Sequence, residues 1–290
     1  MRTENLSYLK ASLWFTMSIL CGFFNDFILR YIAVNNTIMI PVVQATFYRF
    51  FFSACFLFPF FIVGKKSSLT AQSKNHFIRS ILLLVPMLLW TYGVSHSSLI
   101  FATFMEFSIP FFVSIIAYFF LHESIEKRLV SIVLGCAGVF LVAFKYIEFS
   151  SLYVVFAMVL ACILYATLDV VNKYLLNKNE SLINMLFFSS LGVSILTLPF
   201  ILCCYVAIPI NYLILYVIQG LLGNFLIFFI LKAYQLESIS ALQPLRFISF
   251  PLSILFGLKL GDNISFLYII FGFSFLLLSL IYSINHELKK

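Results

Sequence analysis

The sequence predicts an all-α integral membrane protein of ten transmembrane helices, arranged as two inverted five-helix repeats. Three observations predict this fold: a very apolar composition, apolar blocks long enough to cross a bilayer, and polar residues that recur at a nearly constant spacing. Of the 290 residues, 63% are hydrophobic and 10% are charged, whereas a soluble domain has roughly 25% charged residues. So few charges cannot cover a water-soluble surface, and a bilayer is the expected environment.

Cutting the chain at its polar breaks separates apolar spans of about 18 residues or more, the length that crosses roughly 30 Å of hydrocarbon. In the first half these spans are 9–29, 40–63, 78–94, 99–121 and 129–147. The first span runs past Asp26 without a small-residue cleavage site, so it is expected to stay as a helix rather than leave as a signal peptide. Only residues 95–98 separate the third span from the fourth.

In the second half the spans are 152–176, 183–206, 212–231, 240–260 and 264–284. The joints are short throughout, which predicts a compact helical bundle without a soluble domain. The two halves are expected to form repeats over residues 1–148 and 149–290.

The repeat rests on polar residues that recur 139 or 143 residues later: Glu123 as Asp262, Asp26 as Asp169, and Arg30 as Lys173. Each half holds five spans, an odd number, so the second half must enter the membrane upside down. This is the inverted-repeat plan of secondary transporters, which bind their substrate near the midplane between the halves.

Lys and Arg predict the orientation. With a cytoplasmic N-terminus, 13 of them fall on the cytoplasmic side, Arg79 among them, and 3 fall outside. Arg49 and Arg246 remain inside the membrane. This bias predicts ten spans with both termini in the cytoplasm, and for a bacterial protein the expected membrane is the cytoplasmic (inner) one. The bias also accounts for the net charge of +7 without nucleic acid as a partner.

Cofactor and catalytic motifs are missing from the sequence. The six cysteines lie inside apolar blocks without metal-ligand spacing, so neither disulfides nor a metal is expected: Cys21, Cys55, Cys136, Cys162, Cys203 and Cys204. No glycine-rich phosphate-binding loop occurs, and His-Glu occurs once, at His122-Glu123, without the second His of a zinc protease. We therefore expect no cofactor and no enzyme.

The end of the fourth span carries a family signature. The run from Phe107-Ser108-Ile109-Pro110 to Phe120-Leu121-His122-Glu123 resembles the "P…LxE" ending of the EamA-type branch of the drug/metabolite transporter superfamily. Lys259-Leu260-Gly261-Asp262 repeats this ending in weaker form, with Asp in place of the family's usual Glu.

Other stretches are similar to the S-adenosylmethionine uptake transporters of that superfamily, among them Trp90-Thr91-Tyr92-Gly93 and Leu168-Asp169-Val170-Val171-Asn172-Lys173. The resemblance covers nearly the whole chain. It implies uptake of a small polar metabolite by alternating access without ATP, with exchange for S-adenosylhomocysteine as one form of coupling.

Five ionisable residues lie inside spans, where each costs at least about 2.5–3.5 kcal/mol: Asp26, Arg49, Glu106, Asp169 and Arg246. Three helix-breaking prolines lie near them and indicate a cavity: Pro110, Pro244 and Pro251. A rise of 1.5 Å per residue places Glu106 and Arg246 on the order of 10 Å apart in depth. We therefore expect no direct ion pair between these two residues.

This gap suits a cargo with a charge at each end. We expect Glu106 to neutralise a cationic part of the cargo, while Arg49 or Arg246 holds its carboxylate. S-adenosylmethionine, with a sulfonium, an ammonium and a carboxylate, is such a cargo. Three aromatic residues are candidates to stack on adenine or to face the sulfonium: Trp90, Tyr92 and Tyr118. The alternatives are a structural pair between Glu106 and one Arg, and aromatic side chains that only pack.

Two i,i+4 pairs are candidate gates, Asp26 with Arg30 near the outer face and Asp169 with Lys173 near the inner face. The alternative is an interfacial ion pair worth less than about 1 kcal/mol. Two other functions stay open, an exporter of amino acids or related metabolites and a membrane scaffold. The oligomeric state also stays open, with a homodimer as one option.

Overall fold

The computed structural model describes residues 2–36, 39–63, 73–123, 130, 133–135, 137–138, 151–262, 270–275, 277–279 and 281–282. These residues form helices and no strand. Eight of the helices described are long and apolar enough to cross a membrane. The fifth and tenth predicted spans, 129–147 and 264–284, fall mostly outside the described residues.

Six of the crossing segments are continuous helices: α1 (Arg2–Asn35), α2 (Val42–Val63), α3 (Ser73–His96), α7 (Leu152–Asn177), α8 (Leu182–Cys203) and α9 (Ile210–Leu236). The other two are broken. One consists of α4 (Leu99–Glu106) and α5 (Ile109–Leu121), and the other of α10 (Ile239–Leu242), the 3-10 helix η1 (Gln243–Ile248) and α11 (Ser249–Lys259).

The broken segments carry their prolines where a helix starts. Pro110 lies in the first turn of α5 and Pro244 at the start of η1, positions where the missing backbone N–H would have no partner in the helix. Pro251 lies in the first turn of α11. Ser108 Oγ donates to the Met105 carbonyl at 2.7 Å, which satisfies one carbonyl released by the first break. Both breaks are buried within the bundle, the place where a bilayer protein tolerates irregular backbone.

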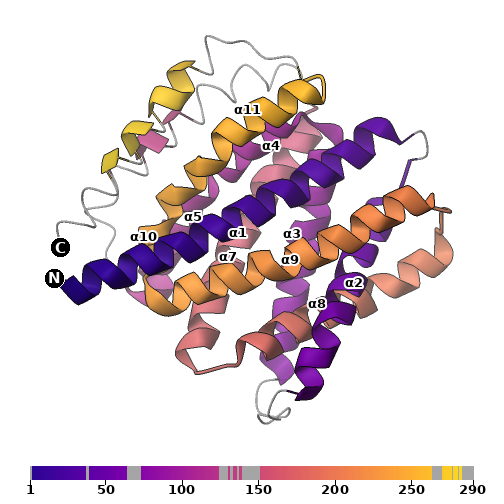
Figure 1. The fold of residues 1–290 in the computed structure, drawn as a ribbon, viewed down its shortest axis with the longest axis horizontal. Coiled ribbons are helices and arrows are strands. Elements are labelled where there is room, and N and C mark those ends of the chain that lie inside the picture. The colour runs from indigo at the N-terminus through magenta and orange to yellow at the C-terminus, as the bar shows by residue number, and fades with distance from the viewer. Residues whose placement is uncertain are drawn as a thin grey trace.

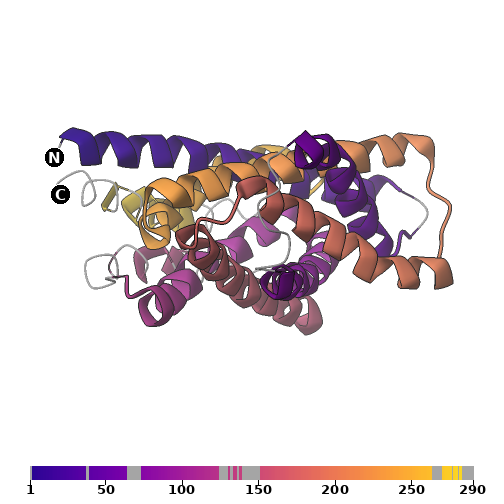
Figure 2. The ribbon, with the colours of Figure 1, turned by 90° about the horizontal axis from the view of Figure 1, so that it is seen from below.

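The helices pack in two layers (Figures 1 and 2). The helices α1 and α9 run side by side on one face, and α3 and α7 pair on the other. The helix α2 packs against α8 and α9. Where the broken segments meet, the aromatic rings of Phe107 and Phe247 lie 5.1 Å apart edge to face, and those of Phe104 and Phe250 lie 4.9 Å apart. This aromatic contact holds the two breaks next to each other in the interior.

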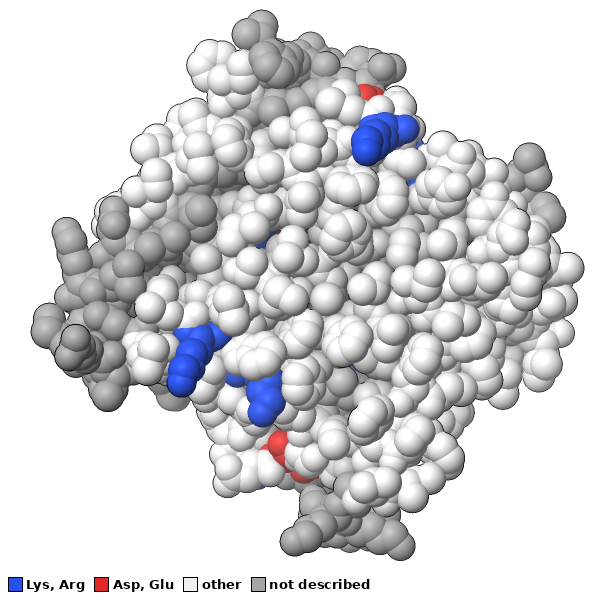
Figure 3. All heavy atoms as spheres, in the orientation of Figure 1, with Lys and Arg blue, Asp and Glu red and all other residues white. Residues whose placement is uncertain are grey.

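The outer surface is that of a membrane protein. On the face in Figure 3, the Lys and Arg side chains lie near two opposite edges, and the broad region between them is almost without charge. Large apolar side chains such as Phe60, Phe119 and Leu202 are mostly exposed. An apolar belt between two charged ends matches a hydrocarbon layer with water on each side.

Candidate functional site

A cavity of about 140 Å³ lies in the interior, and its lining comes from α1, α2, α3, α7 and α9 together with the two broken segments. Six ionisable residues line it: Asp26, Arg49, Arg79, Glu106, Asp169 and Arg246. Trp90 and Tyr165 contribute aromatic rings to the same wall. The fold thus brings all five predicted intramembrane charges to one cavity and adds a sixth.

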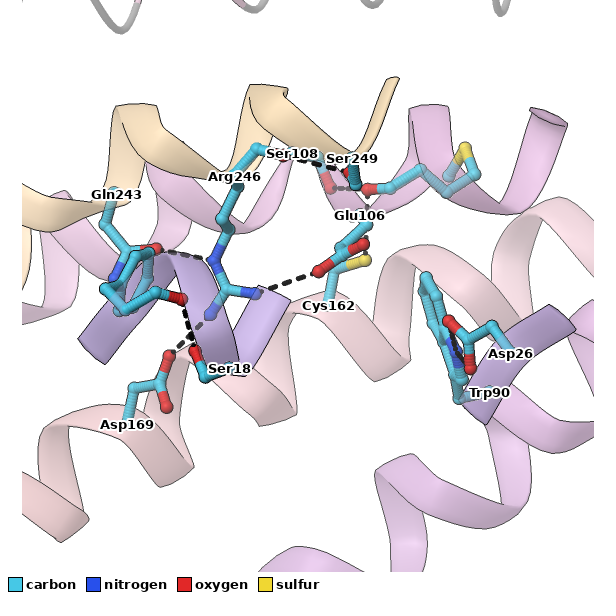
Figure 4. Close-up of polar contacts among 12 residues, drawn as sticks. Ser18, Asp26, Trp90, Glu106, Ser108, Cys162, Asp169, Gln243, Arg246 and Ser249 are labelled. Carbon is cyan, nitrogen blue, oxygen red and sulfur yellow. Dashed lines mark hydrogen bonds and ion pairs between the residues drawn. The ribbon is translucent and has the colours of Figure 1, made fainter. Parts of the chain in front are cut away.

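Arg246, on η1, is the most fully paired charge. It is 8% exposed, and its Nη1 and Nη2 bind Glu106 Oε1 at 3.0 Å and Asp169 Oδ2 at 3.1 Å. Its Nε donates to Gln243 Oε1 at 2.8 Å, and Figure 4 shows the guanidinium between the two carboxylates. We call Glu106, Asp169 and Arg246 the charge triad.

The triad corrects the expected separation of Glu106 and Arg246, which make a direct ion pair. The prediction measured depth along straight, continuous helices. Both segments are in fact broken near these residues, and two long side chains reach across the space between the backbones.

Asp26 lies apart from the triad (Figure 4). Both of its carboxylate oxygens accept hydrogen bonds from Trp90 Nε1, each at 3.1 Å. The predicted pair with Arg30 is not made, because Arg30 Nη1 donates to the Ser95 carbonyl at the end of α3, at 2.9 Å. Trp90, one of the predicted aromatic residues, therefore lies in the cavity wall as the partner of an acid.

The second predicted gate pair is not made either. Asp169 binds Arg246, while Lys173 Nζ donates to two carbonyls at the end of α9, those of Tyr234 and, at 2.9 Å, Glu237. Arg30 and Lys173 thus have the same role, since each caps a helix C-terminus, where free carbonyls favour a cation. The two acids of the predicted gates face the cavity instead.

Arg49, on α2, has few partners. Its Nη1 lies 3.2 Å from Met87 Sδ, and its guanidinium carbon lies 5.5 Å from the centre of the Phe50 ring. Within the described residues, no carboxylate lies at ion-pair distance from Arg49.

Arg79 is a cavity residue that sequence reasoning missed. It was counted among the cytoplasmic loop residues, but it is 1% exposed inside α3. Its Nε donates to Asn172 Oδ1 at 2.6 Å, and its Nη1 donates to the Met185 carbonyl and to Ser189 Oγ. The error lies in where the helix starts. The predicted span begins at residue 78, whereas α3 begins at Ser73 and so places Arg79 nearly two turns inside the helix.

Tyr165 was also missed. Its hydroxyl donates to Met87 Sδ at 3.3 Å, and its ring meets Trp90 edge to face with 6.1 Å between the ring centres. The chain has 15 tyrosines, and no sequence signal separates Tyr165 from the others.

Two predicted aromatic site residues do not line the cavity. Tyr92 follows the cavity residue Trp90 by two positions, a turn of about 200° around α3, and its ring packs on His96 instead. Tyr118 follows the cavity residue Ile109 by nine positions, about half a turn from it in direction, and is 51% exposed. Helical geometry therefore points both tyrosines away from the cavity.

Two acids beyond the cavity cap the broken segments. Asp262 Oδ2 accepts from the backbone N–H groups of Leu99 at 2.8 Å and Ile100 at 3.4 Å, at the start of α4. Glu123 accepts from the backbone N–H groups of Ile239 and Ser240, both at 3.1 Å, at the start of α10. Burial raises the pKa of the Asp262 carboxyl above its usual range, although Arg30 and the two N–H groups oppose the shift. Each acid of the sequence signature is therefore a helix cap.

The site has the chemistry of ligand binding. In the part of the chain that the structure describes, no three His, Cys, Asp or Glu side chains are placed to hold a metal. The charges of both signs, the indole and the phenol line one cavity, which suits a small polar molecule with charged ends.

Comparisons with known proteins agree with this description. The model of the EamA-like transporter family matches residues 12–144. An S-adenosylmethionine uptake transporter of Rickettsia conorii is 34% identical over 252 residues, 86% of this chain and 83% of that protein. The transporter of the same description in Rickettsia prowazekii is 31% identical over 249 residues, 85% of this chain and 83% of that protein.

A solved crystal structure has the same fold. It superposes with a TM-score of 0.70 over 99% of this chain and 98% of its own, at 11% sequence identity. At so low an identity the likeness concerns the fold alone. The rickettsial relatives cover most of both chains, and the chain therefore belongs to the EamA-like transporter family, as a multi-pass membrane protein with these uptake transporters as its relatives.

Proposed function

We propose that this protein is a secondary transporter that takes up S-adenosylmethionine across a bacterial cytoplasmic membrane. The observation that carries the proposal is the likeness to the rickettsial uptake transporters over most of both chains. The cavity supports it, because S-adenosylmethionine combines two cationic groups, a carboxylate and an aromatic base. Carboxylates, guanidinium groups and aromatic rings that complement these features line one space.

The proposal includes ten transmembrane helices in two inverted five-helix repeats, 1–148 and 149–290. The helix packing supports it. In the proposed repeat α1 corresponds to α7, α2 to α8, and α3 to α9, and exchanging these counterparts maps the main contacts among the six helices onto one another. The contact of α1 with α9 becomes that of α7 with α3, and α2 with α9 becomes α8 with α3.

The capping acids support the same symmetry. Glu123 of the first half caps the broken segment of the second half, and Asp262 of the second half caps that of the first. These acids are the pair that recurs at 139 residues. A reciprocal exchange of this kind is what a two-fold axis between repeats produces.

Removing the charge from these caps is expected to lower stability. Asp262→Asn and Glu123→Gln should each lower the free energy of unfolding by about 0.5–2 kcal/mol, the range of a lost helix cap. Denaturant unfolding in detergent micelles measures the change. Glu237→Gln, at the end of α9, is the matched control and should have a smaller effect. An effect of the control equal to that of both variants would contradict the capping role.

The cavity size supports alternating access. Its volume of about 140 Å³ is below the roughly 300–1,000 Å³ of typical ligand pockets. A cargo as large as S-adenosylmethionine therefore requires the halves to move apart on one side, as alternating access implies. Both termini are proposed to be cytoplasmic, and the bias of Lys and Arg that supports this persists when Arg79 is removed from the count.

Uptake by intact cells tests the proposal. A bacterium that does not import S-adenosylmethionine should, on expressing this protein, accumulate the radiolabelled compound in a saturable way. S-adenosylhomocysteine should compete, and methionine and adenosine should compete much less. Glu106→Gln should lose most of the uptake, because it leaves Arg246 with one carboxylate partner.

No uptake by a protein shown to be in the membrane would overturn S-adenosylmethionine as the cargo. Membership of the transporter family would stand, and amino-acid export would become the function to test.

A further inference from the structure

We infer that Arg49 and Asp26 form the subsite for an α-amino-acid head group, in which Arg49 binds the carboxylate and Asp26 binds the ammonium. The inference rests on the proposed function only in requiring a cargo that carries such a group. It assigns the head group to two residues outside the charge triad, and it gives Asp26 a binding role in place of a gating one.

Four of the six cavity charges, those of the triad and of Arg79, are already bound by protein groups. The triad occupies Arg246 with two carboxylates and one amide oxygen. Arg79 directs its donors to neutral groups, an amide oxygen, a carbonyl and a hydroxyl, and it is almost fully buried. Each of these two guanidinium groups is thus held by three protein acceptors. Two charges of the cavity remain, one of each sign.

Arg49 is the open cation. A guanidinium has five N–H donors in a planar fork that matches a carboxylate. Among the described residues, its one hydrogen bond goes to the thioether sulfur of Met87, a weak acceptor. The side chain lines the cavity and is partly exposed to it. A buried guanidinium without an anion is unfavourable, and the carboxylate of a bound cargo supplies that anion.

Asp26 is the open anion, because the repeat is asymmetric at one position. Its counterpart Asp169 receives Arg246 from the second broken segment. The residue that matches Arg246 in the first broken segment, 139 positions earlier, is Phe107. Within the part of the chain that the structure describes, Asp26 therefore receives only the indole N–H of Trp90, and its carboxylate has lone pairs left for an ammonium.

Arg49 and Asp26 line the same cavity, and Arg49 lies beside Gly223 of α9. A Cβ atom on Gly223 would lie 3.5 Å from Arg49 Nε and 4.0 Å from Asn25 Nδ2. Asn25 precedes Asp26 and is fixed to α9 by two hydrogen bonds with Gln219, of 3.3 and 2.8 Å. Arg49 of α2 therefore lies next to the part of α9 that binds α1, the helix that carries Asp26. An α-amino-acid group carries its ammonium and its carboxylate on the same carbon atom, which suits a cavity wall with one cation and one anion.

Binding to the full-length protein in lipid nanodiscs, measured by calorimetry, tests the Arg49 assignment. The wild type should bind S-adenosylmethionine roughly tenfold to a hundredfold more tightly than decarboxylated S-adenosylmethionine, the range for a hydrogen bond to a charged group. Arg49→Gln should abolish this preference, so that both ligands bind with similar affinity. Arg49→Lys, which keeps the charge without the fork, should retain part of it.

A variant that keeps the full wild-type preference would overturn the assignment of Arg49. Arg49→Lys decides the question if Arg49→Gln does not fold. A wild type that binds neither ligand would contradict the proposed cargo instead, so the two failures are distinguishable.

The charge on sulfur tests the Asp26 assignment. S-adenosylhomocysteine keeps the ammonium and lacks the sulfonium charge. Asp26→Asn should therefore weaken binding of S-adenosylmethionine and of S-adenosylhomocysteine by similar factors, each roughly tenfold to a hundredfold. A loss confined to S-adenosylmethionine would place the sulfonium at Asp26 and overturn the assignment to the ammonium, and unchanged affinity for both would overturn the subsite.

Discussion

Replacing Arg246 with Gln is expected to destabilise the protein by about 3–5 kcal/mol, the range for removing one partner of a buried ion pair. The change leaves Glu106 and Asp169 facing each other in the interior without the guanidinium between them. Two carboxylates in this position repel each other and lose their bonds to the guanidinium. Denaturant unfolding in detergent micelles measures the loss, and uptake by cells should fall with it.

Two further variants separate charge pairing from general damage. Lys178→Gln removes an exposed cation at the end of α7 and should change stability by about 0.5 kcal/mol or less. The triple variant Arg246→Gln with Glu106→Gln and Asp169→Asn should recover part of the loss, because it removes all three charges of the triad together and leaves neither carboxylate without its partner. If the triple variant recovers none of the lost stability, the three residues do not act as an electrostatic unit.

Replacing Gly220 with Ala is expected to destabilise the contact between α9 and α2 by about 1–3 kcal/mol, the range for overpacking. A Cβ atom on Gly220 would lie 2.8 Å from the backbone N of Ser53 and 2.9 Å from the backbone O of Arg49. Both neighbours are backbone atoms and cannot rotate away, so the helices must separate. Small residues at such contacts are the usual way for membrane helices to pack closely.

Gly223→Ala, one helical turn further along α9, is the matched control. A Cβ atom there would meet Arg49 Nε at 3.5 Å, an ordinary contact distance with a flexible side chain. Thermal unfolding in detergent should therefore show a clear decrease for Gly220→Ala and little change for Gly223→Ala. Equal effects of the two substitutions would contradict the backbone contact as the cause.

The sequence identified the charges of the cavity better than their partners. All five ionisable residues placed inside spans line the cavity, because a charge in hydrocarbon is so unfavourable that it must turn inward. The partners were wrong in three cases, Asp26 with Arg30, Asp169 with Lys173, and Glu106 kept apart from Arg246. Spacing along one helix shows which side chains can meet on it, and it says nothing about carbonyls or charges that a neighbouring helix presents.

The aromatic residues and Arg79 show the same limit. Trp90 and Tyr92 are equal candidates in the sequence, and only the orientation of α3 separates them, because two positions along a helix point in nearly opposite directions. Arg79 lies close enough to a span end to be taken for a loop residue. Only the packing of α3 against α7 and α8 shows that it is buried among polar groups.

The sequence by itself determined the membrane environment, the helical class and five of the six charges that face the cavity, because these follow from the free energy of placing each side chain in hydrocarbon. The tertiary structure alone decided which charges neutralise one another and which remain open to a ligand. Those outcomes depend on distances of a few ångströms between helices far apart in the chain. At Asp26 and Asp169 two similar helices receive different neighbours, Trp90 in one case and Arg246 in the other.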